Sequence, residues 1–146
     1  MENEKYTTFE ELYGKFLSKI NDYGLATTNS DDFEFILENY LSAALGLYYN
    51  GNLTERIKDM NVEEKHFGTK LTLKEQWMLV LAMVYQWTDE QIYQRQLMQT
   101  AISNRDFSES APANQLRAMN TIRDTLKAEM HKHDVEYSYI GFDGFS

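Results

Sequence analysis

The sequence contains no cysteine, one proline and three histidines among its 146 residues. Without cysteine, the chain cannot form a disulfide framework, a thiolate nucleophile or a zinc ribbon. Its apolar runs are short, because the longest, residues 77–85, is well below the ~20 residues that a membrane-spanning helix needs. The first residues also lack the basic character of a secretory leader. We therefore expect neither secretion nor insertion into a membrane.

Basic residues are outnumbered, and the imbalance is concentrated at one end of the chain. The formal net charge is −9, and residues 1–64 alone hold thirteen acids and five bases, a balance of −8. Affinity for nucleic acid comes mostly from Lys and Arg that neutralise phosphates, so the first half of the chain should repel DNA. An acidic surface that only aids solubility is the alternative.

No catalytic or metal-binding pattern is present in the sequence. His131 and His133 are two positions apart on a predicted helix, so their side chains point ~200° apart and cannot share a metal. Carboxylate pairs such as Glu63-Glu64 are neighbours in sequence rather than facing groups. Phosphate-binding loops, nucleophile elbows and His-Glu-x-x-His are all lacking. We expect no enzymatic activity, no cofactor and no bound metal.

Helix signals dominate the first half of the chain. Thr8 and Glu11 have the spacing of a capping box and precede an apolar face that ends near residues 21–24. A second helix follows Asp31-Asp32 and stops at Asn50-Gly51. Residues 53–71 are irregular, and they fit short helical turns together with a loop or a short hairpin arm.

The second half begins with the most apolar part of the sequence. Thr72 and Glu75 form a capping box before residues 77–85, which are apolar on every side and must be enclosed. We assign four large side chains here to the core or to a subunit interface: Trp77, Leu81, Tyr85 and Trp87. Thr88 opens a further helix or a bent continuation of this one, and a last helix runs from Ser110-Ala111-Pro112 to about residue 133.

The composition changes after Asp134. Apolar residues alternate with polar ones and glycines follow, which predicts an extended segment. This segment either folds back on its own bundle or docks on a partner through apolar anchors, namely Val135, Tyr137, Tyr139, Ile140, Phe142 and Phe145. The predicted fold is all-α: a single domain over residues 1–134, with four to five helices and an irregular 53–71 segment, followed by an extended C-terminal arm over 135–146.

One local pattern is similar to a DNA-binding motif. Residues 71–81 followed by 87–92 have the spacing of a helix-turn-helix, which makes a DNA-binding regulator or a protein like the small terminase subunit the alternative function. The turn lacks its usual glycine, and the recognition helix would carry Asp89 and Glu90 against Arg95 alone.

A wider stretch resembles the small head-tail connector, or adaptor, proteins of tailed bacteriophages. The resemblance covers residues 67–139. Five sequence segments carry it: residues 67–75, Met83-Val84-Tyr85-Gln86-Trp87, the 105–111 connector, the helix over 116–130, and Glu136-Tyr137-Ser138-Tyr139.

The resemblance implies an all-helical virion subunit that forms a ring, expected to be twelvefold, under the portal protein in the neck. Such a ring extends the DNA channel and joins the portal to the next neck or tail protein, and DNA passes through without sequence-specific binding. A terminal arm in these families often docks on the portal, which is the role implied for residues 135–145. A negative lumen lets DNA slide, and candidates for its lining are Asp31, Asp32, Glu34 and Glu38.

A ring also requires two different complementary surfaces on each subunit. Residues 77–85 and the aromatic edge of the second helix are the candidates for these surfaces. A third hypothesis is an intracellular helical scaffold unrelated to phage, which would remain a monomer or dimer.

Overall fold

The computed structural model describes residues 6–22, 33–47, 53–103 and 110–143. These ranges are mostly helical, as the sequence predicts, and they include one small antiparallel hairpin. The elements in chain order are α1 (Phe9–Asp22), α2 (Phe33–Leu47), α3 (Thr54–Ile57), β1 (Met60–Asn61), β2 (His66–Phe67), α4 (Leu73–Ser103) and α5 (Ser110–Asp143).

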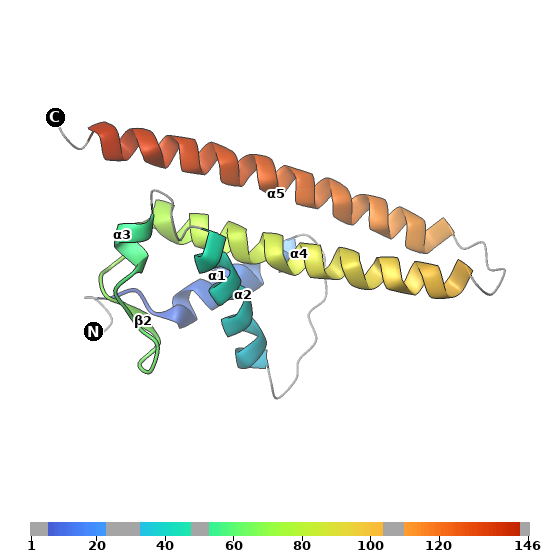
Figure 1. Cartoon of the computed structure of the whole chain (residues 1–146), viewed down its shortest axis with the longest axis horizontal. Helices are drawn as coiled ribbons and strands as arrows, with labels where there is room; N and C mark the ends of the chain where they lie inside the picture. The colour runs from blue at the N-terminus through green and yellow to red at the C-terminus, as the bar shows by residue number, and fades with distance from the viewer. Residues whose placement is uncertain (1–5, 23–32, 48–52, 104–109, 144–146) are drawn as a thin grey trace.

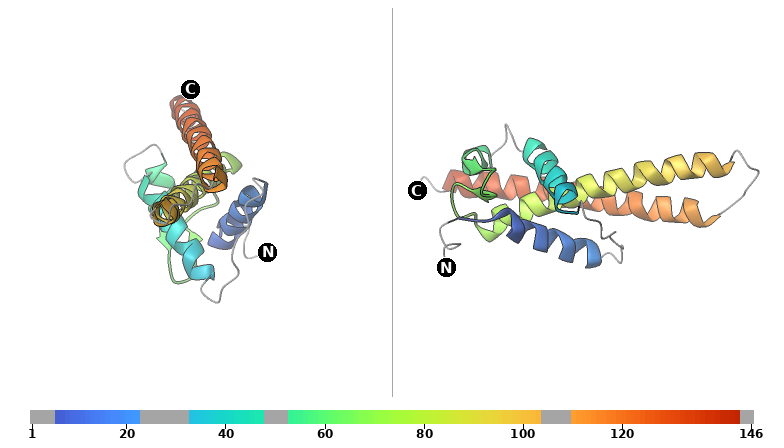
Figure 2. Two further views of the ribbon diagram at one scale, coloured as in Figure 1. Left: turned by 90° about the vertical axis from the view of Figure 1, so that its right-hand side faces the viewer. Right: turned by 90° about the horizontal axis from the view of Figure 1, so that it is seen from below.

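Two long helices, α4 and α5, form an antiparallel hairpin that runs the length of the molecule (Figure 1). Two side-chain links fix its register: Glu75 with Tyr137, and Asp89 with Arg123. Both helices advance by fourteen residues between the two links, so the register of α4 against α5 is the same at both. The far half of this hairpin projects beyond the other elements, as the right-hand view in Figure 2 shows.

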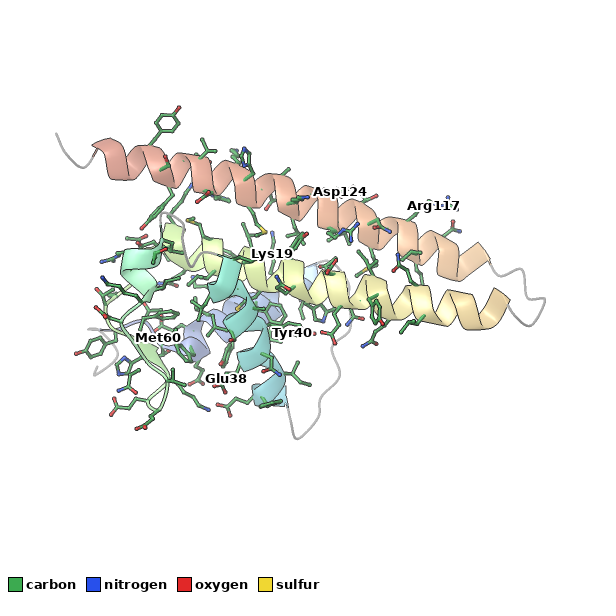
Figure 3. All side chains as sticks on the ribbon, in the orientation of Figure 1. Lys19, Glu38, Tyr40, Met60, Arg117 and Asp124 are labelled. Atoms are coloured by element: carbon green, nitrogen blue, oxygen red, sulfur yellow. The ribbon has the colours of Figure 1, made fainter. Side chains whose placement is uncertain are left out.

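The remaining helices pack on the first half of α4 and enclose it. Seven consecutive side chains of α4, residues 78–84, are at most 3% exposed. They are covered by α1, α2 and α5, with Phe16, Leu41 and Leu126 among the fully buried partners. The sequence-based prediction that this run must be enclosed is therefore confirmed. Tyr40 of α2 adds a polar link, because its hydroxyl donates to the carboxylate of Glu90 on α4 (Figure 3).

Residues 53–71 form a short helical turn and a hairpin. Leu53, Ile57, Phe67 and Leu71 are buried, so this irregular segment is part of the core. β1 and β2 pair Met60 with Phe67, and the strand β2 is bonded in turn to the chain just before α1. A Cβ on Gly68 would lie 2.0 Å from the carbonyl oxygen of Asp59, so only glycine fits at this crossing.

Both predicted capping boxes, at Thr8 and at Thr72, provide a helix cap. Thr72 and Glu75 bond reciprocally, with the Thr72 N–H donating to Glu75 at 2.8 Å and the Glu75 N–H donating to the Thr72 hydroxyl at 3.1 Å. At α1 the N–H of Glu11 donates to the Thr8 hydroxyl. Thr88 is not a cap: it is buried inside α4, and its hydroxyl donates to the Val84 carbonyl one turn earlier.

The helix-turn-helix prediction is wrong. Residues 85–88 continue α4 without a turn, because no glycine or proline interrupts the chain between residues 73 and 103. The extended arm is also wrong over its described part, since α5 continues past His133 to Asp143. A glycine such as Gly141 costs a helix only about 1 kcal/mol, which does not stop it.

Candidate interaction surfaces

The C-terminal part of α5 divides its apolar side chains between two faces. Tyr137 packs against the core, whereas Val135 and Tyr139, one turn apart, are 40% and 65% exposed. One aromatic of this segment therefore folds back on the bundle, and two apolar side chains remain open to solvent. The side chains of Ile140 and Phe142, and the whole of Phe145, lie outside the described residues. Docking of this segment on a portal stays a prediction.

Tyr137 belongs to a polar cluster that joins three elements. Glu75 is 2% exposed and accepts two hydrogen bonds from Arg56, at 2.9 and 3.2 Å, and one from the Tyr137 hydroxyl. Arg56 also donates to the carbonyl of Lys70. Lys74 and Glu136 form an ion pair beside the cluster. The cluster therefore ties α3, the start of α4 and the end of α5 together. It also gives a buried carboxylate the hydrogen bonds that such a group needs.

The pKa of Glu75 is set by two opposing effects. Burial raises the pKa, but the hydrogen bonds from Arg56, Tyr137 and the Thr72 N–H outweigh it, so the pKa is lowered. The pKa of the Tyr137 hydroxyl is raised, mostly by burial and also by its hydrogen bond to the Glu75 carboxylate. At neutral pH the cluster thus consists of an ionised carboxylate, a guanidinium and a protonated tyrosine.

This lowered pKa predicts a specific loss of stability in acid. Because the folded-state pKa of Glu75 lies below its unfolded value of about 4.3, its contribution is complete above that value and is lost as the pH falls through the folded pKa. We expect the difference in free energy of unfolding between the wild type and Glu75→Gln to be largest near pH 7. Urea titrations at pH 7 and pH 3 check this, and a difference that is equal at both would contradict it.

Two of the four acidic residues predicted to line a channel lie in the described ranges. Asp31 and Asp32 lie outside the described residues. Glu34 and Glu38 are one turn apart on α2, and Glu34 forms an ion pair with Lys65 at 2.6 Å. Figure 3 shows Glu38 in the body of the molecule, away from the projecting hairpin. Their role in a channel stays a prediction.

A groove of about 680 Å³ lies between α1, α2 and the turn of the β-hairpin. Its apolar lining comes from Phe9, Leu17 and Leu37, and its rim carries Glu10, Glu34, Glu64 and Lys65. Gly14 of α1 also lines it, and a Cβ there would meet nothing within 4 Å. Tyr13 lines the groove too, and its buried hydroxyl has no hydrogen-bond partner among the described residues. Burial and the nearby Glu38 and Glu34 raise the pKa of Tyr13 to about 12.

The four side chains assigned to the core or an interface have separate positions. Leu81 and Trp87 are buried and Tyr85 is partly buried against the core, so these three are core residues. Trp77 is 37% exposed, and the ammonium of Lys15 lies 5.2 Å from the centre of its ring. Residues 78–84 are buried in the core, so they are not accessible for contacts between copies of the chain.

Two exposed apolar pairs were not singled out from the sequence. Tyr93 and Leu97 lie one turn apart on the projecting half of α4 and are 60% and 55% exposed. Phe35 and Ile36 are exposed at the start of α2. Both pairs continue the apolar periodicity of their helices, and only the position of the neighbouring helices shows that nothing in the described chain covers them.

The histidines do not form a site in the described ranges. His131 is exposed and His133 is partly buried. His66 bonds to the Phe67 carbonyl and to Glu64, and its ring stacks on Tyr6; the backbone hydrogen bond contributes most to its raised pKa. No group of three or more His, Asp or Glu residues in the described part could hold a metal ion. None of the helices described is sufficiently long and apolar to cross a membrane.

Comparisons with known proteins give no relative for this chain. No protein-family model, curated protein or solved structure matches it.

Proposed function

We propose that this chain is a head-tail connector subunit of a tailed bacteriophage. Copies of it form a ring under the portal, extend the DNA channel and join the portal to the next neck or tail protein. The observation that carries the proposal is the pair of separate exposed apolar surfaces, Phe35 and Ile36 on the body and Tyr93 and Leu97 on the projecting hairpin. Heterologous contacts, which close into rings, need two such different surfaces on each subunit.

Two further features support the proposal. The sequence resemblance to connector proteins covers residues 67–139, and this range corresponds to β2, α4 and nearly all of α5. The body that packs on this hairpin carries most of the negative charge, including Glu34 and Glu38 on α2. An acidic surface facing a channel repels the phosphates of passing DNA and so avoids retaining them.

Portal docking is assigned to the outer face at the end of α5. Changing Val135 and Tyr139 together to serine removes two exposed apolar anchors, and we expect binding to portal to fall by about tenfold or more. Tyr137 is left in place because its hydroxyl and ring stabilise the fold. The measurement is co-sedimentation of the full chain with assembled portal protein.

A matched control uses the exposed Tyr6 and Val62, which belong to the segment before α1 and to the turn of the β-hairpin rather than to α5. Tyr6→Ser with Val62→Ser removes the same two residue types and should leave portal binding unchanged. Equal binding by both double variants would remove the α5 face from the docking role. A wild-type chain that does not sediment with portal would contradict the proposed function itself.

A further inference from the structure

The two ends of the molecule differ in charge. The projecting half of the hairpin, residues 91–103 and 110–123, contains three arginines and no acidic residue: Arg95, Arg117 and Arg123. The connecting residues 104–109 add one arginine and two acids, so the net charge of residues 91–123 is +2. Arg123 pairs with Asp89, whereas Arg117 is exposed on α5. The register of the hairpin places Arg117 opposite the turn of α4 that carries Tyr93 and Leu97. This end thus combines a positive charge with exposed apolar side chains.

The groove in the body has complementary features. Three carboxylates, Glu10, Glu34 and Glu64, stand around an apolar floor; Glu34 is paired with Lys65, and Glu64 with His66. Gly14 of α1 lines the groove, and a Cβ there would meet no heavy atom within 4 Å. An apolar segment carrying a guanidinium meets all of these features.

The hairpin of the same copy cannot occupy the groove. It is held straight on α4 by the links at Glu75 and Asp89, and it points away from the body (Figure 3). Arg117 lies twenty residues along α5 from Tyr137, which corresponds to about 30 Å in a helix. A second copy of the chain can present its hairpin without distortion.

We propose that the projecting hairpin of one copy docks in the acidic groove of the next. Arg117 pairs with the carboxylates of the rim, and the neighbouring apolar side chains contact the floor. The contact is head-to-tail, so each copy offers both halves and the assembly can close. This inference rests on the proposed function. The receiving side of the ring contact is the groove, whose rim residue Glu34 directly precedes the exposed Phe35 and Ile36 of α2.

Filling the groove tests the contact without harming the fold. Gly14→Met places a side chain in open space and removes a glycine from a helix interior, so the monomer should be at least as stable. We expect the concentration needed for assembly to rise by about tenfold or more. Gly46→Met is the matched control: Gly46 also lies in a helix with nothing near its Cβ, but it does not line this groove. Light scattering over a concentration series measures both.

Charge exchange identifies the arginine. Arg117→Glu should weaken assembly by about tenfold, and combining it with Glu10→Arg should restore it, because the pair is reversed. Lys127→Glu makes the same change of charge at an exposed position outside the projecting half and should have little effect.

The outcomes separate this inference from the proposed function. If Gly14→Met and Arg117→Glu assemble like the wild type into rings, the hairpin-to-groove contact is wrong and the ring-forming function stands. If the wild type does not assemble at any concentration, the proposed function fails. Rings in the wild type that are lost in Gly14→Met, retained in Gly46→Met and restored by the charge exchange are the result we expect.

Discussion

Replacing Glu75 with alanine is expected to lower the free energy of unfolding by about 2–3 kcal/mol. The change leaves the Arg56 guanidinium, the Tyr137 hydroxyl and the Thr72 N–H without their shared acceptor. Breaking a buried ion pair by removing one partner typically costs about 3–5 kcal/mol, and the partial exposure of Arg56 reduces this because water can hydrate the freed charge. Chemical denaturation followed by circular dichroism at neutral pH measures the loss.

The control for this variant is Glu63→Ala, at an exposed position in the turn of the β-hairpin. It removes the same charge from the chain, so it corrects for the change in net charge, and we expect an effect within about 0.5 kcal/mol. If Glu75→Ala lowered the free energy of unfolding no more than Glu63→Ala, the polar cluster would not be what holds the end of α5 against α4.

Leu126→Ala is expected to destabilise the chain by about 3 kcal/mol. Leu126 is fully buried, and with Met119 it is one of two α5 residues that are buried in the described chain. Truncation loses the transfer free energy of the removed carbons and leaves a cavity against α4 that two straight helices cannot close. The measurement is the shift of the urea midpoint at constant slope.

Thr125→Ala provides the matched control on the neighbouring, exposed face of α5. Its hydroxyl bonds only within the helix, to the Thr121 carbonyl, and alanine favours helix slightly, so stability should be unchanged or a little higher. A loss in Leu126→Ala of less than 1 kcal/mol would show that α5 is not held by this contact.

Helix positions and the central core could be predicted from the sequence because both depend on local signals. The capping box at Thr72 and Glu75 and the uninterrupted apolar run over residues 77–85 led to the correct start and enclosure of α4. Of the two alternatives at Thr88, a further helix is wrong and α4 continues, because a threonine can bond back to a carbonyl inside a helix as well as cap one.

The conformation of residues 135–143 could not be read locally. The alternation of Val135, Tyr137 and Tyr139 is compatible with a strand or with a helix that has Tyr137 on one face and the other two on the opposite face. The deciding contact is the hydrogen bond from Tyr137 to Glu75, sixty-two residues earlier in the chain. No signal near Tyr137 in sequence indicates that partner.

The candidate surfaces also depend on contacts between distant segments. Gly14 and Tyr13 form part of a groove only because α2 and the turn at residues 64–65 lie beside α1. Tyr93 and Leu97 are exposed because the described chain provides no helix beyond the body to cover them, although their spacing suits a core. The acidic character of the body, by contrast, was visible from composition alone.

The central claim is that copies of this chain close into a ring. Native mass spectrometry of the full wild-type chain, combined with negative-stain images of the same sample, tests it most directly. We expect a single closed assembly, twelvefold as the resemblance to connector proteins implies, with a central hole. A monomer or dimer at every concentration, with no ring in the images, would contradict the account.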